Sequence, residues 1–467
     1  MFPKSILNYN NTNTAVILPN GDKFSYGDLQ SYSKKIYQKI NNRCLVFCLS
    51  KNHIGSLCGY ISFLSNKVVC LLLDSSISPE LIEPLINKYK PQYLWLPIER
   101  VDLSKFGKPA FRLLEHTLLK TDFDNKIKLN KNLALLLTTS GSLGSPKLVR
   151  LSYQNILSNA ISIADYLSID KNERPITLLP IHYSFGLSII NSHLIKGATI
   201  LLNDFSLMNK GFWEFLKNYQ STSLSGVPYS FEILKKLRFF KLYFPYLRTI
   251  TQAGGKLNDE LISEFAYFCQ KNDKRFFVMY GQTEASPRIS YLPYEYSTLK
   301  LGSIGIAIPG GKLSLINDQG KVIKRDETIG ELVYEGPNVS MGYAFDCNDL
   351  AKNDENNGVL LTGDIARRDK DSFYYIVGRK KRFIKLYGNR INLDETERLL
   401  KNMIPDVACT GKDDNMIIYI TEKKYLNKIS SFISEKIGIN SNAFIIKLIE
   451  NIPKNTSGKT IYSELPN

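Results

Sequence analysis

The sequence predicts an α/β protein with a large N-terminal domain, a β-rich subdomain and a small α+β C-terminal domain. Up to about Gly302, apolar runs alternate with amphipathic stretches, a pattern typical of βα units in a mostly parallel sheet. After that point short runs of alternating residues are separated by turns, which favours antiparallel hairpins. Residues 382–467 mix short strands with helices, enough for a small separate domain.

The N-terminal body is predicted from its alternation of strands and helices. Strands are expected over 44–50, 67–74 and 93–97, with helices over 53–65 and 80–90 between them. Further β-branched or aromatic runs, bounded by Gly, Asn, Asp or Pro, predict strands at 197–204, 222–228 and 275–281. The runs at 44–49 and 68–73 are too short to cross a bilayer, and no secretory signal is expected at the N-terminus.

The later part of the chain is predicted to contain hairpins and then a mixed segment. Strands are expected at 312–318, 331–336 and 372–379, with a turn at Asp318 to Gly320. Beyond them, strands are expected at 416–421 and 443–449, and helices at 394–403 and 425–437.

Composition limits the class of protein and its partners. With 467 residues, 43% of them hydrophobic, the chain is neither disordered nor fibrous. Its net charge of +16 fits phosphate-bearing ligands, an acidic protein partner or nucleic acid, but no single stretch forms a polybasic arm. Seven cysteines without a CxxC pair favour a reduced cytoplasm.

A Ser/Thr/Gly-rich loop lies between an apolar strand and a helical pattern that starts after Ser152. Glycines let a backbone approach a phosphate, hydroxyls donate hydrogen bonds, and a lysine supplies positive charge. The loop residues that could wrap phosphates are Thr139, Ser140, Gly141, Ser142, Gly144 and Lys147. The spacing differs from a P-loop, because Lys147 follows Gly144 by three residues. Taken alone, the loop fits a phosphate site and an ordinary Ser/Gly turn equally well.

Four further segments carry polar groups in turns or on glycine-containing loops. Tyr280 to Glu284 sets an aromatic ring, a hydroxyl and a carboxylate after an apolar strand, and a nucleotide with a hard cation could use all three. Thr362 to Asp364 is an acidic turn that could accept ribose hydroxyls. Residues 378–391 are dense in basic residues, and residues 452–461 place a lysine near the C-terminus. Each segment alone also fits a surface turn, a helix start, a solvated strand or a flexible tail.

Together, in this order, these segments resemble the motifs of the adenylate-forming superfamily, which contains acyl- and aryl-CoA synthetases, adenylation domains of peptide synthetases and firefly luciferase. The resemblance covers nearly the whole chain, and several independent motifs in series rarely coincide. In chain order the matching segments are TTSGSLGSPK (phosphate loop), LPIHYSFGLS (acid site), TQAGGKL and YGQTEASPR (adenine and cation), LTGDIARRD (ribose), GRKKRFIKLYGNRI (hinge and thiolation loop) and PKNTSGKTI (terminal lysine). The resemblance implies two doubly wound sheets plus the β-rich subdomain in residues 1–381, and a small mobile lid in residues 382–467.

The resemblance also implies a two-step reaction. A carboxylate attacks the α-phosphate of Mg·ATP to give an acyl-adenylate and pyrophosphate, and a thiol then displaces AMP. Charge builds on the phosphates while two anions meet, so electrostatic positioning should dominate catalysis.

Roles for the nucleotide-binding residues follow from the same resemblance. Thr139, Ser140, Ser142 and Lys147 would hold the β- and γ-phosphates, with Gly141 and Gly144 allowing close approach. Glu284 would bind Mg²⁺ and Thr283 would contact the α-phosphate. Tyr280 would stack on adenine, in the motifs that also contain Gly254, Gly255 and Gly281. Asp364 would bind the ribose hydroxyls, assisted by Arg379.

Roles on the lid are implied in the same way. Lys459 would bridge the carboxylate and the α-phosphate oxygens. Lys381 would mark the hinge, and Lys385 and Gly388 would lie in the thiolation loop.

The chain departs from the family pattern at several positions. Leu143 stands where Thr is usual, Leu148 where Gly is usual, and Lys381 where Asp is commoner. His182 stands where relatives that activate amino acids carry an Asp for the α-ammonium, so α-amino acids should be poor substrates. His182 and its neighbour Tyr183 are candidates for the acid-binding site, and a packed histidine at a strand end is the alternative for His182.

The sequence thus predicts a cytoplasmic ligase that uses ATP, Mg²⁺ and coenzyme A on a simple carboxylic acid, aliphatic (such as a fatty acid) or aryl. The acceptor could instead be the phosphopantetheine arm of an acyl carrier protein, because both acceptors end in the same thiol. A non-catalytic adenylate-binding protein and a nucleic-acid-binding module are the alternatives outside this class. The joint presence of Glu284, Asp364 and Lys459 argues against the first, and the acidic site motifs argue against the second.

Overall fold

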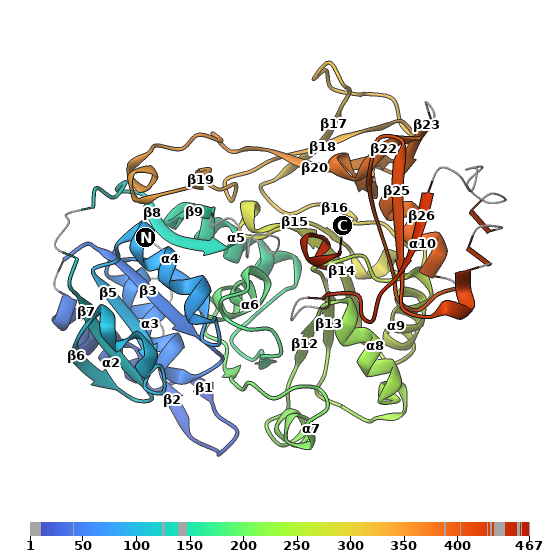
Figure 1. The fold of residues 1–467 in the computed structure, drawn as a ribbon. Coiled ribbons are helices and arrows are strands. Elements are labelled where there is room, and N and C mark those ends of the chain that lie inside the picture. The colour runs from blue at the N-terminus through green and yellow to red at the C-terminus, as the bar shows by residue number, and fades with distance from the viewer. Residues whose placement is uncertain are drawn as a thin grey trace. The chain divides into compact units, whose positions relative to one another are not determined.

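Figure 1 shows the fold in a computed structural model of the chain. The structure describes residues 11–40, 42–123, 127–138, 147–386, 389–401, 403–426, 428–429, 432–433, 444–454, 458 and 460–466. By their contacts the residues form two compact units. The large unit comprises Met1–Lys312 and Glu335–Leu360, and the small unit comprises Leu313–Tyr334 and Leu361–Asn467.

The first sheet of the large unit has eight strands, with a parallel centre and antiparallel edges. Its strand order is β19 (Tyr343–Ala344), β9 (Leu148–Ser152), β8 (Leu133–Thr138), β4 (Val69–Asp74), β3 (Leu45–Ser50), β5 (Tyr93–Pro97), β7 (His116–Thr121) and β6 (Gly107–Leu113). Strands β8, β4, β3 and β5 run parallel, and β9, β7, β6 and β19 pair antiparallel.

Both faces of this sheet are buried, which explains the continuous apolar runs. In β3, Val46 and Cys48 belong to a core cluster with α3 (Ile54–Ser65), while Phe47 and Leu49 belong to a second cluster with α4 (Pro79–Tyr89). Successive side chains of a strand point to opposite faces. The two helices therefore cover opposite faces of the sheet, as in a doubly wound fold.

The second sheet of the large unit has nine strands and is drawn largely in green and yellow in Figure 1. Its strand order is β16 (Ile306–Ala307), β15 (Arg288–Leu292), β14 (Arg275–Gly281), β13 (Thr249–Gln252), β12 (Ser223–Gly226), β10 (Pro175–Ile176), β11 (Ile200–Leu201), β1 (Thr14–Ile17) and β2 (Lys23–Ser25). Strands β14, β13, β12, β10, β11 and β1 run parallel to one another, and β2, β15 and β16 pair antiparallel at the two edges.

The remaining helices of the large unit pack on these sheets. They are α2 (Tyr26–Ile40), α5 (Tyr153–Tyr166), α6 (Ser184–Leu194), α7 (Lys210–Asn218), α8 (Pro228–Lys236) and α9 (Asp259–Lys271). One core cluster joins side chains of α2, α3 and α6 with strands of both sheets. Helix α5 begins where predicted, because the Ser152 hydroxyl accepts from the Asn155 N–H and the Asn155 side chain accepts from the Ser152 N–H.

The described part of the small unit contains three sheets. A four-stranded sheet has the order β17 (Lys312–Ile316), β18 (Ile329–Glu335), β20 (Val359–Arg368) and β21 (Tyr374–Arg379). A hairpin follows, β22 (Phe383–Leu386) with β23 (Asn389–Asn392), and then α10 (Leu393–Lys401). Strands β24 (Val407–Lys412), β25 (Asn415–Ile420) and β26 (Phe444–Leu448) form the third sheet. Side chains of the described residues between 384 and 446 form a hydrophobic core of their own.

The predicted fold class is confirmed: the chain is α/β, with two doubly wound sheets, a β-rich segment and a small α+β C-terminal part. The strand expected over 197–204 contains only the two residues of β11, since the Asn203 side chain and backbone bond to Thr177 in place of a longer ladder. The helix expected over 425–437 lies partly outside the described residues. The hinge at Lys381 remains a prediction. Among the described residues, no helix combines the length and the apolarity that crossing a membrane requires.

Candidate active site

The predicted phosphate loop connects β8 to β9, and Thr139, Ser140, Gly141, Ser142 and Gly144 lie outside the described residues. Its last predicted member, Lys147, is described. The Nζ of Lys147 lies 4.0 Å from the centroid of the Tyr343 ring, a distance at which a cation is attracted to the face of an aromatic ring. Tyr343 therefore holds the ammonium at the start of β9.

Tyr343 also contacts the predicted metal ligand. Its hydroxyl donates to Oε1 of Glu284 over 2.7 Å. Burial, with the negative charge of Glu284 nearby, raises the pKa of Tyr343, so the phenol stays protonated and keeps donating. One aromatic side chain thus brings Lys147 and Glu284 together, as the sequence motifs imply.

The segment that carries Thr283 and Glu284 leaves the sheet at the end of β14. Tyr280 pairs with Ser290 of β15, and the next residue, Gly281, comes so close to its neighbours that an added Cβ would lie 2.1 Å from the Pro287 oxygen. A glycine is therefore required at 281. Thr283 then starts a short 3₁₀ turn over Thr283–Ala285, and its hydroxyl lies 3.3 Å from that of Ser184.

The acid-site segment enters helix α6 next to this turn. Nδ1 of His182 lies 3.3 Å from the Ser50 carbonyl oxygen, and its Nε2 lies 3.6 Å from Oδ2 of Asp74. Burial lowers the pKa of His182. The imidazole therefore packs against the carboxyl ends of β3 and β4. The nearby carboxylate of Asp74 was not predicted from the sequence.

Tyr183 contacts the predicted adenine motif instead. Gly254 has φ +85°, and a Cβ at this position would lie 2.7 Å from the Tyr183 hydroxyl and 3.0 Å from Val227. The side-chain amide of Gln252 donates to the Gly255 carbonyl oxygen over 2.8 Å, which closes the turn after β13. Gly254 is thus needed for a left-handed turn and for a close approach.

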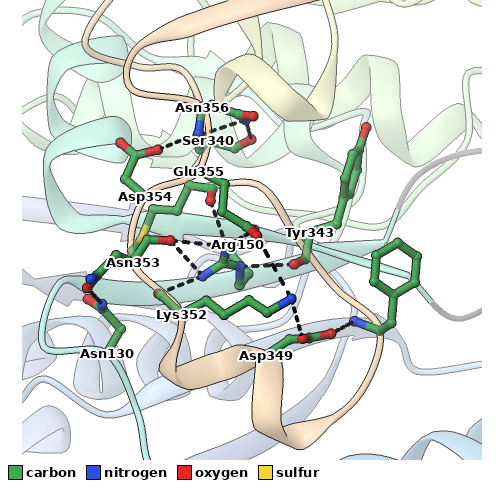
Figure 2. A network of polar contacts seen from close by, with 12 residues as sticks. Asn130, Arg150, Ser340, Tyr343, Asp349, Lys352, Asn353, Asp354, Glu355 and Asn356 are labelled. Carbon is green, nitrogen blue, oxygen red and sulfur yellow. Dashed lines mark hydrogen bonds and ion pairs between the residues drawn. The ribbon is translucent and has the colours of Figure 1, made fainter.

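A buried arginine that sequence reasoning missed supports Tyr343. Figure 2 shows Arg150 of β9 at the centre of a polar network with the segment over residues 340–356. Arg150 is fully buried, and it donates to the carbonyl oxygens of Met341, Tyr343 and Lys352 over 2.7, 3.0 and 2.7 Å. It also donates to the Glu355 carboxylate over 2.5 Å. The signal in the sequence was a charged residue in the middle of the apolar strand LVRLS.

The ribose and hinge residues belong to the small unit. Asp364 of β20 pairs with Arg379 of β21, and their side chains approach to 3.3 Å between Oδ1 and Nε. The Asp364 side chain is 10% exposed and that of Arg379 is 67% exposed. The structure therefore brings these two predicted residues together.

The remaining lid residues are seen partly or not at all. Lys381 lies in a short 3₁₀ turn over Lys380–Arg382, and Lys385 pairs with Arg390 in the β22–β23 hairpin. Gly388 and Lys459 lie outside the described residues.

The described side chains of the large unit suit a bound triphosphate with a hard cation. No group of three or more His, Cys, Asp or Glu residues that could hold a metal occurs among the residues described. A single carboxylate fits Mg²⁺ that is bound mainly through substrate phosphates and water. Glu284, oriented by the Tyr343 hydroxyl, supplies that carboxylate, and Lys147 supplies a positive charge for the phosphates.

Two doubly wound sheets with these side chains are the combination that the sequence motifs imply for an enzyme that binds a nucleotide. The family model described as AMP-binding enzyme matches residues 92–344, more than half of the chain. The chain therefore belongs to the AMP-binding enzyme family, and the predicted membership of the adenylate-forming superfamily is confirmed.

The named relatives include CoA ligases and a luciferin 4-monooxygenase of Photuris pensylvanica. The 2-succinylbenzoate–CoA ligase of Bacillus cereus is 27% identical over 351 residues, which cover 72% of this chain and 70% of that protein. A long-chain-fatty-acid–CoA ligase of Escherichia coli is 26% identical over 371 residues, which cover 76% and 65%. Among solved structures, the O-succinylbenzoate coenzyme A synthetase of Bacillus subtilis in complex with AMP is similar in fold, with a TM-score of 0.79 at 21% identity over 100% and 98% of the two chains.

Proposed function

We propose that this chain is an ATP-dependent carboxylate–CoA ligase that works through an acyl-adenylate. In the first step the acid's carboxylate displaces pyrophosphate from ATP, and in the second step the thiol of coenzyme A displaces AMP. The observation that carries the proposal is Tyr343, which joins the lysine of the phosphate loop to the predicted metal ligand. Such an arrangement places opposite charges where a metal triphosphate would bridge them.

The side chains of the large unit would hold and orient the triphosphate. Lys147 would neutralise charge on the β- and γ-phosphates, and the Thr283 hydroxyl would donate to the α-phosphate. Mg²⁺ held at Glu284 would supply further positive charge when bound. The loop hydroxyls of Thr139, Ser140 and Ser142 would complete the phosphate site, and Tyr280 would stack on the adenine.

The small unit would supply the ribose contact and the second lysine. Asp364, with its carboxylate held by Arg379, would accept the ribose hydroxyls. Lys459 would bridge the two reacting anions in the first step, and Lys385 and Gly388 would face the thiol in the second step. These assignments rest on the motif resemblance and on family membership.

The preferred substrate is a simple carboxylic acid and the preferred acceptor is coenzyme A. Relatives named for an aryl acid and for long-chain fatty acids support both acid classes. An acyl carrier protein is the second acceptor, and the net charge of +16 suits an acidic carrier as well as the CoA nucleotide. A reduced cytoplasm remains the predicted location.

The proposal is tested by measuring pyrophosphate release from ATP and Mg²⁺ over a panel of aliphatic, aryl and α-amino acids. We expect release that depends on one class of non-amino acid, with AMP as the second product. The acceptor is then identified by mass detection of the thioester with coenzyme A or with a phosphopantetheinylated carrier protein. Release of ADP and phosphate, or no dependence on any acid, would contradict the proposal.

A further inference from the structure

Arg288 is a buried cation in the large unit. It starts β15, seven residues after Gly281, and it is 2% exposed. Its Nε is buried and has no hydrogen-bond partner, and within the part of the chain that the structure describes it forms no ion pair. A buried charge is normally paired, because removing it from water without compensation is costly.

The backbone of Arg288 is held firmly, so its side chain is directed by the fold. Asn159 donates to the Arg288 carbonyl over 3.1 Å and accepts from its N–H over 3.3 Å, and Asn338 donates to the same carbonyl over 2.8 Å. The guanidinium carbon lies 4.7 Å from the centroid of the Phe185 ring. Burial raises the pKa of Tyr166 to about 12, and the nearby positive charge of Arg288 opposes that rise.

The Arg288 side chain lines a small cavity between helices α5 and α6 and the nine-stranded sheet. Apolar side chains such as Ile163, Phe185 and Met279 form one part of the wall, and hydroxyls such as those of Ser225 and Thr251 form another. About 20 Å³ of it is open to the centres of water molecules, room for one or two waters. This space suits a small polar group better than a long alkyl chain.

The carboxylate that shares this cavity is already paired. Glu173 accepts from Arg248 over 2.9 Å and from the Thr222 hydroxyl, and its side chain is 5% exposed. Its charge is therefore balanced without Arg288. The guanidinium of Arg288 therefore lines the cavity as a positive charge that Glu173 does not balance.

The cavity lies beside the predicted reaction centre. Helix α6 begins at Ser184, whose hydroxyl is 3.3 Å from that of Thr283, and the next residue is Phe185, whose ring faces Arg288. Two consecutive residues of α6 therefore link the Thr283 turn to the wall of the cavity that Arg288 lines.

We propose that Arg288 binds a second carboxylate of the acid substrate, so that the enzyme activates one end of a dicarboxylic acid. The planar guanidinium offers paired N–H donors that match a carboxylate. This inference rests on the proposed function and narrows its substrate class. It makes Arg288 a specificity-determining residue. Arg288 ends the segment YGQTEASPR, whose other candidate site residues are predicted to bind the nucleotide and its metal ion.

The test compares acids of equal carbon number in the pyrophosphate-release assay: butyrate with succinate, pentanoate with glutarate, hexanoate with adipate, and phenylpropanoate with its ortho-carboxy derivative. We expect the wild-type enzyme to use at least one diacid with a kcat/KM about 100-fold above that of its matched monoacid. Arg288→Met should remove this preference by lowering kcat/KM for the diacid while leaving the monoacid unchanged. Arg288→Lys should keep part of the preference for the diacid, since lysine retains the positive charge but lacks the paired N–H donors of a guanidinium.

Two controls keep the outcomes distinct. Arg325 is exposed and lies in the small unit, so Arg325→Met should leave both acids unchanged. Melting temperatures of the variants show whether each one folds. If Arg288→Met does not fold, the preference of the wild-type enzyme for diacids over monoacids still tests the inference. Two results would overturn this inference and leave the proposed function standing. One is that the wild-type enzyme uses monoacids as well as or better than every diacid. The other is that a folded Arg288→Met loses kcat/KM equally for both acids. Absence of turnover with all acids would instead contradict the proposed function.

Discussion

At the scale of single residues, Tyr343 makes two contacts that can be separated by mutation. The hydroxyl orients Glu284 and the ring faces Lys147. Tyr343→Phe removes the first contact and keeps the second. Because side chains that orient a metal ligand typically change metal affinity by about 10- to 100-fold, we expect this variant to need at least tenfold more Mg²⁺ for half-maximal pyrophosphate release.

Tyr343→Leu is the matched control, because it removes the ring as well. It should show the same change in Mg²⁺ requirement and, in addition, a raised KM for ATP. If Tyr343→Phe responds to Mg²⁺ as the wild type does, the hydroxyl has no role in orienting the metal ligand.

A second prediction at this scale concerns His193, which lies buried in α6. Burial lowers its pKa from the usual 6.5 to about 4. Between these values the unfolded chain binds a proton that the folded chain does not, so this group makes the protein less stable as pH falls from 6.5 towards 4. At pH 5 the effect is about 2 kcal/mol.

The measurement is urea unfolding at pH 7.5 and pH 5 for the wild type and for His193→Leu. Other groups also titrate in this range, so the difference between the two proteins isolates the histidine. The wild type should lose more stability than the variant on acidification. An equal loss in both proteins would show that His193 is protonated in the folded state.

Individual site residues were predictable from the sequence where a motif contains them. Lys147, Thr283, Glu284, Asp364 and Arg379 were selected in this way, and the structure brings Lys147 near Glu284 and Asp364 near Arg379. Tyr343 and the unpaired state of Arg288 could not be predicted, because each depends on side chains brought together by tertiary packing. The partners of Arg150 lie about 190 or more residues along the chain.

At the scale of elements, Arg150 joins strand β9 to the segment that ends the large unit. Arg150→Met would leave the carbonyl oxygens of Met341, Tyr343 and Lys352 without this donor. Breaking a buried polar network of this kind costs about 3 to 5 kcal/mol. We expect a loss of that size in the free energy of unfolding, together with weaker ATP binding, since the same segment carries Tyr343.

Glu355→Gln provides the comparison. The Glu355 side chain is 49% exposed, and Gln keeps a side-chain oxygen that can accept from Arg150, so this change should cost less than Arg150→Met. Urea unfolding of both variants measures the contrast. A cost below 1 kcal/mol for Arg150→Met would mean that the network does not hold the segment in place.

Strands that are buried along their whole length could be predicted from the sequence, and very short strands could not. Strands β3, β4 and β5 are buried along their whole length, and their continuous apolar runs predicted them. Strands such as β10 and β19 have only two residues, and they exist because a neighbouring strand pairs with them. No local pattern of side chains specifies so short a strand.

At the scale of the whole molecule, the two half-reactions are predicted to need different lid residues. Lys459→Ala should lower acyl-adenylate formation by about 100-fold, as expected for loss of a group that stabilises transition-state charge. It should still convert supplied acyl-adenylate to the thioester. Gly388→Leu should show the reverse, since a larger side chain there would block the thiol.

Single-turnover measurements of each half-reaction test this pair. The two variants serve as controls for one another, because each should keep one step near the wild-type rate. Equal loss of both steps in both variants would be incompatible with a lid that alternates between two arrangements.

In the proposed reaction the acid is activated through a bond between its own oxygen and the α-phosphate of ATP. The most direct measurement uses an acid labelled with ¹⁸O in its carboxylate, followed by mass analysis of the products formed with ATP, Mg²⁺ and coenzyme A. When the thiol displaces AMP, the bridging oxygen leaves with AMP. We expect one ¹⁸O in AMP, none in pyrophosphate and one in the thioester. Unlabelled AMP, or label in released phosphate, would contradict it.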